Sequence, residues 1–204
     1  MDVWRTWKKY GLKPHQVRRF KLSRDPRLVE KLHDVVGVYL NPPDNAVVFS
    51  FDEKSQIQAL DRTQPGLPLK RGRAGTMTHD YKRHGTTTLF AALEVAGEVI
   101  HECMPRHRHQ EFLRFLKRIE KTVEPGLEIH VVLDNYATHK HEKVRRWLER
   151  HPRVQFHFVP TGASWLNLVE RLFSELDQRQ LKRLAVTSVG ELIAAIETYL
   201  DHRN

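Results

Sequence analysis

Residues 46–55 read AVVFSFDEKS, a run of strand-forming apolar residues that ends in Asp52 and Glu53. A second run, IHVVLD at 129–134, also stops on an aspartate, Asp134. Acids at a strand end are either loop residues that have reached water or groups placed where a sheet opens. If the two strands are parallel neighbours, their carboxyl ends meet at the edge where open α/β sheets bind ligands. We therefore expect the two aspartates to lie close together.

The remaining periodicity indicates an α/β domain with a mixed five-stranded sheet flanked by helices. Three strands follow as a meander, and later strands that are joined by helices must run parallel to the first. Apolar spacings of three and four predict helices, and short apolar runs bounded by turn residues predict strands. The expected helices are 3–10, 26–40, 109–123, 141–150, 167–184 and 189–200, and the expected strands are 46–51, 85–95, 98–104, 128–133 and 154–159.

Positive charge is concentrated in two segments of the chain. The formal net charge is +9, from 34 Lys and Arg against 25 Asp and Glu. Residues 1–44 hold ten Lys or Arg and five Asp or Glu, and residues 61–84 hold six against two. Residues 58–84 have no clear period and are predicted to form a long basic loop. Clustered cations favour a polyanionic partner such as nucleic acid; the alternative is a solvated surface that only keeps the chain soluble.

Length and cysteine content exclude several protein classes. A chain of 204 residues is long enough for one well-buried core. No apolar run approaches the ~20 residues of a membrane helix, and the start MDVWRTWKKYG has no signal-peptide core, so we expect a cytosolic protein. Cys103 is the only cysteine, which excludes an internal disulfide. With His101, His107 and His109 it forms a candidate zinc cluster, but the spacing matches no common structural zinc motif.

Glu170 is the candidate for a third acid near the two aspartates. The segment SWLNLVERLFSEL places it in the first turn of a helix, 36 positions after Asp134. Carboxylates held together repel unless a cation lies between them, and Mg²⁺ prefers oxygen ligands. An alternative is that Asn167 and Glu170 form a capping box, because Glu follows Asn by three positions. Each aspartate taken alone is also more often a polar strand terminus than a metal ligand.

Three separated blocks resemble the DDE transposases of bacterial insertion sequences in the mariner superfamily. They are FDEKSQIQALDRTQPGLPLKRGRAGTMTHDYKRHGTTTLFAAL at 51–93, VVLDNYATHKH at 131–141 and SWLNLVERLFSEL at 164–176. The resemblance implies a ribonuclease-H-like catalytic domain over 45–204. It implies that the catalytic and metal-binding residues, for Mg²⁺ or Mn²⁺, are Asp52, Asp134 and Glu170.

The same resemblance implies an activity and a set of partners. The activity is metal-dependent cleavage of DNA at transposon ends, followed by strand transfer into target DNA, with TA targets favoured. The partners are double-stranded DNA and a second copy of the chain, because two transposon ends must be paired. The resemblance also implies a bacterial protein that is associated with the nucleoid through its DNA.

Further residues are expected to support the acids or to contact DNA. Those predicted to support the metal ligands are Glu53, Asn135, His139 and Asn167. Glu53 follows Asp52 along a strand and is expected on the opposite face of the sheet. Contacts to backbone phosphates, which position DNA without reading its sequence, are predicted for Lys54, Lys70, Arg71, Arg73, Lys82, Arg83 and Lys140.

The start of the chain departs from the family pattern. Such transposases carry helix-turn-helix modules before the catalytic domain, and residues 1–44 are expected to be the remnant of that region plus a basic linker. The chain is therefore expected to be a catalytic fragment or a truncated element. Two alternatives stay open: a ribonuclease-H-like nuclease without strand transfer, and a non-catalytic DNA-binding remnant.

Overall fold

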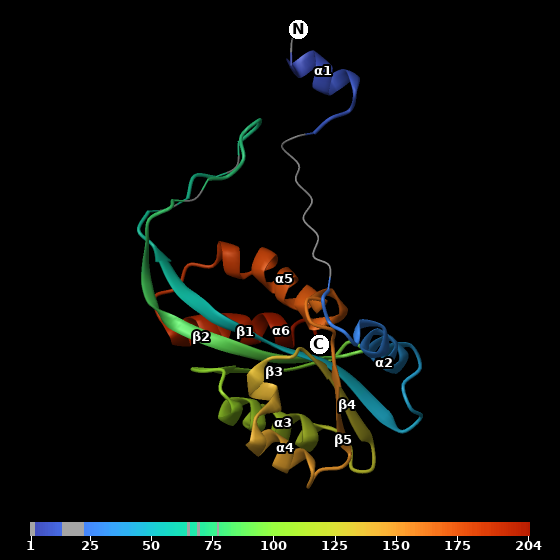
Figure 1. Ribbon diagram of the computed structural model, residues 1–204. Helices are drawn as coiled ribbons and strands as arrows, with labels where there is room; N and C mark the ends of the chain where they lie inside the picture. The colour runs from blue at the N-terminus through green and yellow to red at the C-terminus, as the bar shows by residue number, and fades with distance from the viewer. Residues whose placement is uncertain (1–2, 14–22, 65, 69, 77) are drawn as a thin grey trace.

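The computed structural model describes residues 3–13, 23–64, 66–68, 70–76 and 78–204 (Figure 1). Its centre is a five-stranded mixed sheet, as the sequence predicts, and the strand order is β3-β2-β1-β4-β5. β1, β2 and β3 form an antiparallel meander, while β4 and β5 run parallel to β1. The strands are β1 (Ala46–Arg62), β2 (Tyr81–Glu94), β3 (Val99–Met104), β4 (Glu128–Leu133) and β5 (Val154–Phe158).

Helices cover both faces of this sheet (Figure 1). α3 and α4 pack on one face, and α5 and α6 pack on the other. Short 3-10 turns at 137–140, 164–166 and 181–183 join elements at the edges. The α-helices are α1 (Val3–Lys9), α2 (Leu28–Leu40), α3 (His109–Thr122), α4 (Glu142–Leu148), α5 (Val169–Arg179) and α6 (Val189–Asp201).

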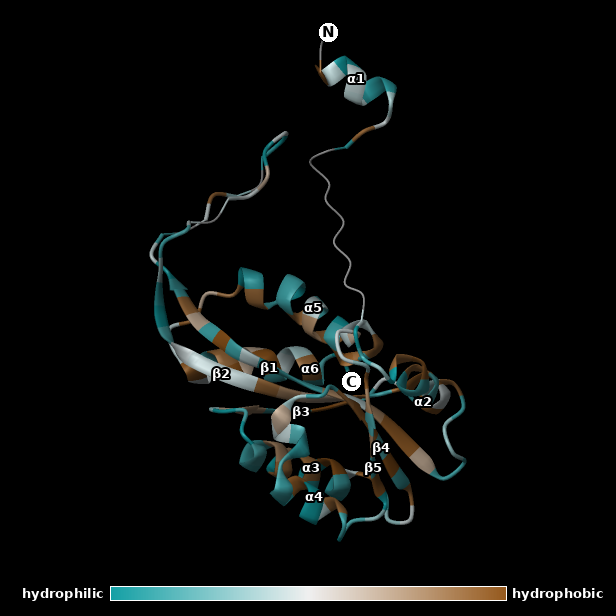
Figure 2. Cartoon of the chain, viewed as in Figure 1, coloured by the Kyte–Doolittle hydropathy of each residue, from teal (hydrophilic) through white to brown (hydrophobic). Residues whose placement is uncertain are grey.

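The core is built by alternation along β1. Phe49 and Phe51 are buried on the α3 side of the sheet, while Val48 and Ser50 are buried on the side of α2 and α5. The Phe51 ring lies 5.0 Å from the ring of Phe112 in α3. Hydrophobic segments follow the strands and the inner helix faces, as Figure 2 shows. Because side chains alternate across a strand, Asp52 falls on the α5 side and Glu53 on the α3 side, as predicted.

The first strand is longer than the sequence suggested. Its parallel pairing with β4 stops at Ser50 and Val132, where the apolar run ends. Its antiparallel pairing with β2 continues to Arg62, so the expected loop at 58–84 is strand at both of its ends. The sequence analysis missed the second half of β1 because its side chains are mostly polar and show no apolar pattern. This half is a strand because its backbone hydrogen-bonds to β2. Asp52 is therefore in mid-strand, at the point where the neighbouring strand departs.

The described residues between β1 and β2 extend this hairpin away from the body. Backbone bridges pair Leu67 with Thr76 and Lys70 with Arg73. The extension projects far beyond the sheet and its tip points toward α1 (Figure 1). The basic segment predicted from the sequence is thus a projecting hairpin arm.

α2 lies inside the segment 1–44 and packs on the sheet. Val35 and Val38 are buried against Val48 and Val132. α1, in contrast, has no buried residue and lies apart from the domain in Figure 1. In the described part of the chain, no helix combines the length and apolarity that crossing a membrane requires.

Phe51 gives a direct test of the core. Its side chain is fully buried and contacts three other phenylalanine rings. We expect Phe51→Ala to lower the free energy of unfolding by about 3–5 kcal/mol, because a large buried ring leaves a cavity. Urea denaturation measures this. Leu40→Ala, at a side chain that is 73% exposed, is the control and should change stability by less than about 0.5 kcal/mol. Equal effects would contradict the packing described.

Candidate active site

The three predicted acids reach one place from three elements. Asp52 lies in β1, Asp134 directly follows β4, and Glu170 is in the first turn of α5. Burial raises the pKa of the Asp52 carboxyl to about 7, and the negative charges of Glu53, Asp134 and Glu170 act in the same direction. The charges of all three neighbours are therefore felt at Asp52. The assignment of these three acids as metal ligands stays a prediction.

A buried polar contact fixes the start of α5 against β1. The Asn167 side chain is 2% exposed, and its Nδ2 donates to the carbonyl of Phe51 at 2.9 Å and to Asp52 Oδ2 at 3.4 Å. Ser50 Oγ donates to Asn167 Oδ1 and accepts from the backbone N–H of Val169 at 2.9 Å. These bonds hold the carboxylate of Asp52 beside the helix that carries Glu170.

The capping alternative for Asn167 is wrong. The residue before α5 is Leu168, with no side-chain cap, and the Asn167 side chain points into the sheet instead. Asn167 thus contacts Asp52, and its role as a support for a metal ligand stays a prediction. The contribution of Ser50 was not predicted, because a serine in an apolar run gives no signal until its partner 117 positions away is known.

His139 links Asp134 to Glu53 behind the site. Its side chain is 1% exposed, and its Nδ1 lies 3.1 Å from Asp134 Oδ1. Its Nε2 lies 3.3 Å from Glu53 Oε2, and the Glu53 side chain is itself 8% exposed. Although Glu53 points away from Asp52, it reaches the second aspartate through the imidazole. Glu53 and His139 are therefore placed to support the acids.

The electrostatics of this triplet favour a charged imidazole. Burial opposes the charge, but the hydrogen bonds to Asp134 and Glu53 raise the pKa of His139 to about 9. Burial likewise opposes the charge on Asp134, but hydrogen bonds from His139 and from the Tyr136 N–H leave its pKa below the ordinary value. Near neutral pH, Asp134 is thus an anion held by a buried cation, while Asp52 is close to half-protonated.

Asn135 and Lys140 stabilise the loop after β4. Asn135 Nδ2 donates to the carbonyl of Val159, and Lys140 Nζ donates to Asn135 Oδ1 at 2.7 Å. The Lys140 ammonium also lies 4.9 Å from the centre of the Phe158 ring. Both residues lie near the acids, with Asn135 acting on the loop and not on a carboxylate.

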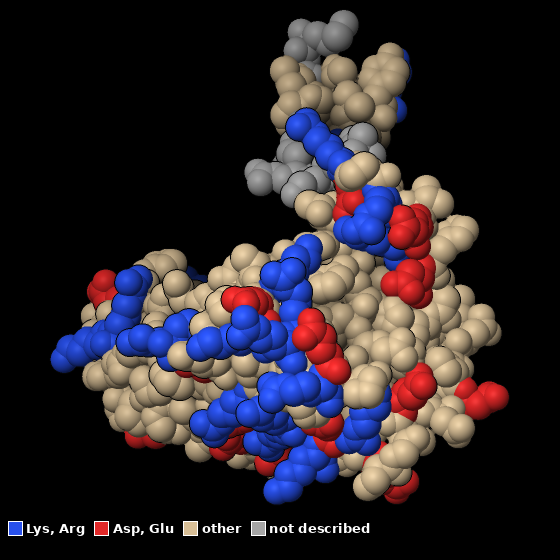
Figure 3. Space-filling view, turned by 60° about the horizontal axis from the view of Figure 1, so that its bottom comes forward, with Lys and Arg blue, Asp and Glu red and all other residues tan. Residues whose placement is uncertain are grey.

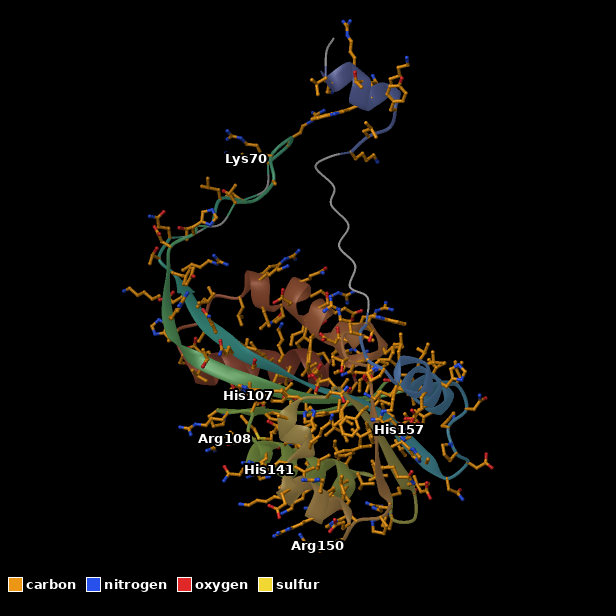
Figure 4. All side chains as sticks on the ribbon, in the orientation of Figure 1. Lys70, His107, Arg108, His141, Arg150 and His157 are labelled. Carbon is orange, nitrogen blue, oxygen red and sulfur yellow. The ribbon has the colours of Figure 1, made fainter. Side chains whose placement is uncertain are left out.

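Of the other predicted DNA contacts, Lys54 lies in β1 within the sheet and five lie along the hairpin arm. Lys54 Nζ is 4.0 Å from Asp177 of α5. The remaining five are exposed, and the arm carries Lys70 far from the carboxylates (Figure 4). These five are Lys70, Arg71, Arg73, Lys82 and Arg83.

The site has the donors for a divalent cation but is not assembled around one. In the described residues, no group of three or more His, Cys, Asp or Glu side chains is arranged to hold a metal ion. Asp52 and Asp134 are instead hydrogen-bonded to backbone N–H groups of Glu53 and Tyr136. A cation would nevertheless find carboxylate oxygens, which hard divalent ions prefer, and it would relieve the mutual repulsion that raises the pKa of Asp52.

The raised pKa of Asp52 predicts an inverted pH dependence of stability. The folded state holds the proton up to about pH 7, whereas the unfolded carboxyl releases it near its ordinary value of about 3.9. The contribution of Asp52 to the stability of the metal-free chain therefore falls as pH rises from about 4 to 7, by on the order of 4 kcal/mol. Asp52→Asn should remove this loss and raise the melting temperature at pH 8. The exposed Asp44→Asn is the control, and identical pH profiles for native and Asp52→Asn proteins would refute the assignment.

The link between Glu53 and His139 predicts a strongly coupled pair. Removing one partner of a buried ion pair costs about 3–5 kcal/mol, because the other charge stays buried. We expect His139→Gln to lose stability of this size, and the Glu53→Gln and His139→Gln double variant to lose less than the sum of the single losses. Urea denaturation at pH 7 measures the cycle. Additive losses would show that the two side chains do not interact.

Comparison with known proteins places the chain in a family. A family model described as DDE superfamily endonuclease matches residues 47–193. A curated relative, the insertion element IS630 uncharacterized 39 kDa protein of Shigella sonnei, is 27% identical over 90 residues, which is 44% of this chain and 26% of the relative. The matched part of the chain thus spans about a quarter of that protein's length.

Two solved structures share the fold. The Mos1 transposase paired-end complex with left transposon end superposes with a TM-score of 0.71 at 15% identity, covering 99% of this chain and 63% of that one. The catalytic domain of Mos1 mariner transposase gives 0.63 at 12% identity, covering 93% and 87%. These similarities confirm the predicted ribonuclease-H-like fold. Together with the family model, which matches most of the sequence, they establish that the chain belongs to the DDE superfamily endonuclease family.

Proposed function

We propose that this chain is the catalytic domain of an insertion-sequence transposase. It cleaves DNA at transposon ends and joins the freed 3′ end to target DNA. The observation that carries the proposal is the convergence of Asp52, Asp134 and Glu170, in the chain order that the resemblance implies, where β1 and β4 separate. The family model over residues 47–193 supports the same reaction class.

Mg²⁺ is the proposed cofactor, and Mn²⁺ is expected to replace it. Asp52, Asp134 and Glu170 would hold the ions, and similar Mos1 complexes have been solved with Mn and with Mg. A pair of such ions activates a water or a 3′-hydroxyl on one side of a phosphodiester and stabilises the leaving oxygen on the other. The same site therefore serves both cleavage and joining, without a covalent bond between protein and DNA.

The surrounding residues keep the three acids in place during both steps. Asn167 orients the carboxylate of Asp52 and anchors α5, which carries Glu170. His139 and Glu53 hold Asp134 from behind. With a cation bound by Asp52, Asp134 and Glu170, ionisation of the Asp52 carboxyl would cost less, because the added positive charge would offset its burial beside other acids.

Double-stranded DNA, as transposon ends and as target, is the proposed substrate. The projecting hairpin arm carries Lys70, Arg71 and Arg73 at its outer part, where they contact backbone phosphates. A homodimer is the proposed assembly, since two ends are paired in one transposition event. The proposed site of action is cytosolic, on nucleoid DNA.

The experiment compares the native chain with Asp134→Ala on labelled duplex DNA. We expect nicking and joining of a pre-cut 3′ end that require Mg²⁺ or Mn²⁺ and are abolished in the variant. Asp44→Ala removes an exposed carboxylate before β1 and should leave both activities unchanged. Cutting without joining would replace the proposal with a plain nuclease. DNA binding by both proteins with no cutting by either would leave a non-catalytic DNA-binding remnant.

A further inference from the structure

A cavity of about 590 Å³ lies between β1, β2, the segment that joins β3 to α3, and the loop after β4. Among the described residues that line it are two arginines and three histidines, and no Asp or Glu. Hydroxyl groups of threonine and of Tyr136 complete the wall. A concave surface that is basic and lacks carboxylates suits an anionic ligand.

This cavity adjoins the candidate active site. Tyr136 forms part of its wall, and its backbone N–H donates to Asp134 Oδ1 at 2.9 Å. Two positions along an extended chain span at most about 7 Å. DNA rises about 3.4 Å per nucleotide along each strand. A strand whose reacting phosphate lies at Asp134 would therefore place a phosphate about two nucleotides away at the mouth of the cavity.

Of the two arginines that line the described part of the cavity, Arg106 is the one whose charge no carboxylate neutralises. It is exposed and has no ion pair or side-chain hydrogen bond within the described part of the chain. Arg108 is different, because Glu111 accepts from its Nη2 at 2.6 Å and from its Nε at 3.1 Å. In Figure 3 the end of the molecule that carries α3 and α4 is turned toward the viewer. Lys and Arg side chains gather on the face seen there.

The histidines are arranged to present donors to such a ligand. His141 Nδ1 accepts from the Lys143 N–H at 3.1 Å, which leaves Nε2 as its donor. Its ring stacks on His109 at 3.8 Å with an interplanar angle of 4°. Desolvation, and then the nearby His141, Lys143 and Arg108, lower the pKa of His109. The positive surroundings that disfavour a proton on His109 favour an anion in the cavity.

We infer that the cavity binds the phosphodiester backbone of the DNA strand that runs past the acids, about two nucleotides from the reacting phosphate. Arg106 supplies the charge, and His107 and His141 donate hydrogen bonds. His107, Arg108 and His141 lie near one another below the sheet, far from Lys70 on the hairpin arm (Figure 4). The inference rests on the proposed function. It gives the DNA a second phosphate contact, separate from those of the hairpin arm.

A zinc site does not account for these histidines. The candidate cluster of the sequence is divided, because His101 Nε2 contacts Asp201 at 3.0 Å whereas His107 and His109 line the cavity. Across the described residues, no set of three possible ligands comes together there or elsewhere. Phosphate recognition gives a role to His107 and His141, whereas the histidines do not form a metal-binding set.

The test is DNA binding measured by fluorescence anisotropy in EDTA, over a series of salt concentrations. For Arg106→Gln, the slope of log K against log salt should become shallower by about one, because one phosphate contact is lost. Affinity should fall equally for duplexes of unrelated sequence, because backbone contacts carry no sequence information. Arg106→Lys keeps the charge and should retain the native slope. Thermal unfolding verifies that each variant is folded.

Arg150→Gln is the matched control. This variant also removes one positive charge, but Arg150 lies just after α4, at the end opposite to His141 (Figure 4). At ~1.5 Å per helical residue, the two residues are about 13 Å apart. Its slope should equal that of the native chain. An unchanged slope in Arg106→Gln, or an equal change in Arg150→Gln, overturns the inference.

The outcome is separable from that of the proposed function, because binding in EDTA requires no catalysis. If Arg106→Gln has a shallower slope but the native chain never cuts DNA, phosphate binding in the cavity is supported and the proposed catalytic function is refuted. If the native chain cuts DNA but the slope of Arg106→Gln is unchanged, the catalytic function is supported and phosphate binding in the cavity is refuted. A chain that binds no DNA overturns both.

Discussion

The separation of β1 from β4 is the constraint on which the site depends. The two strands pair in parallel only as far as Ser50 and Val132, and both then reach an aspartate within two residues. β1 continues because β2 still satisfies its backbone, whereas β4 ends and its chain turns into a loop. Asp52 is therefore held by the pairing of β1 with β2, whereas Asp134 is held by its contacts with the Tyr136 N–H and with His139.

Two buried polar links convert this opening into a defined site. On one face, Ser50 and Asn167 join β1 to the start of α5; on the other, His139 joins the β4 loop to Glu53. Buried polar groups are costly unless they are hydrogen-bonded, and here each has a partner. The result is an asymmetry between the aspartates: one is buried near like charges with a raised pKa, and the other is held as an anion by a cation.

Basic groups lie at two distances from these acids. The hairpin arm carries exposed cations far outside the domain, whereas the cavity presents Arg106 and histidines beside Asp134. An exposed flexible cation contributes mainly counterion release on DNA. A cation in a concave wall also restricts where the strand lies. The arm therefore suits capture of DNA and the cavity suits alignment of the strand, in agreement with the proposed chemistry.

The sequence by itself determined the order of strands and helices along the chain, and it supplied the hypothesis that Asp52, Asp134 and Glu170 form the site. Periodicity is a local property, and each acid follows an apolar run or opens a helix that can be read from its neighbours. Only the tertiary structure decided that Asp52 lies in mid-strand, that Ser50 binds Asn167, and that Glu53 reaches Asp134 through His139. These contacts join residues 86 to 117 positions apart. Local pattern carries no signal for them, because their energy arises only when packing excludes water from both partners.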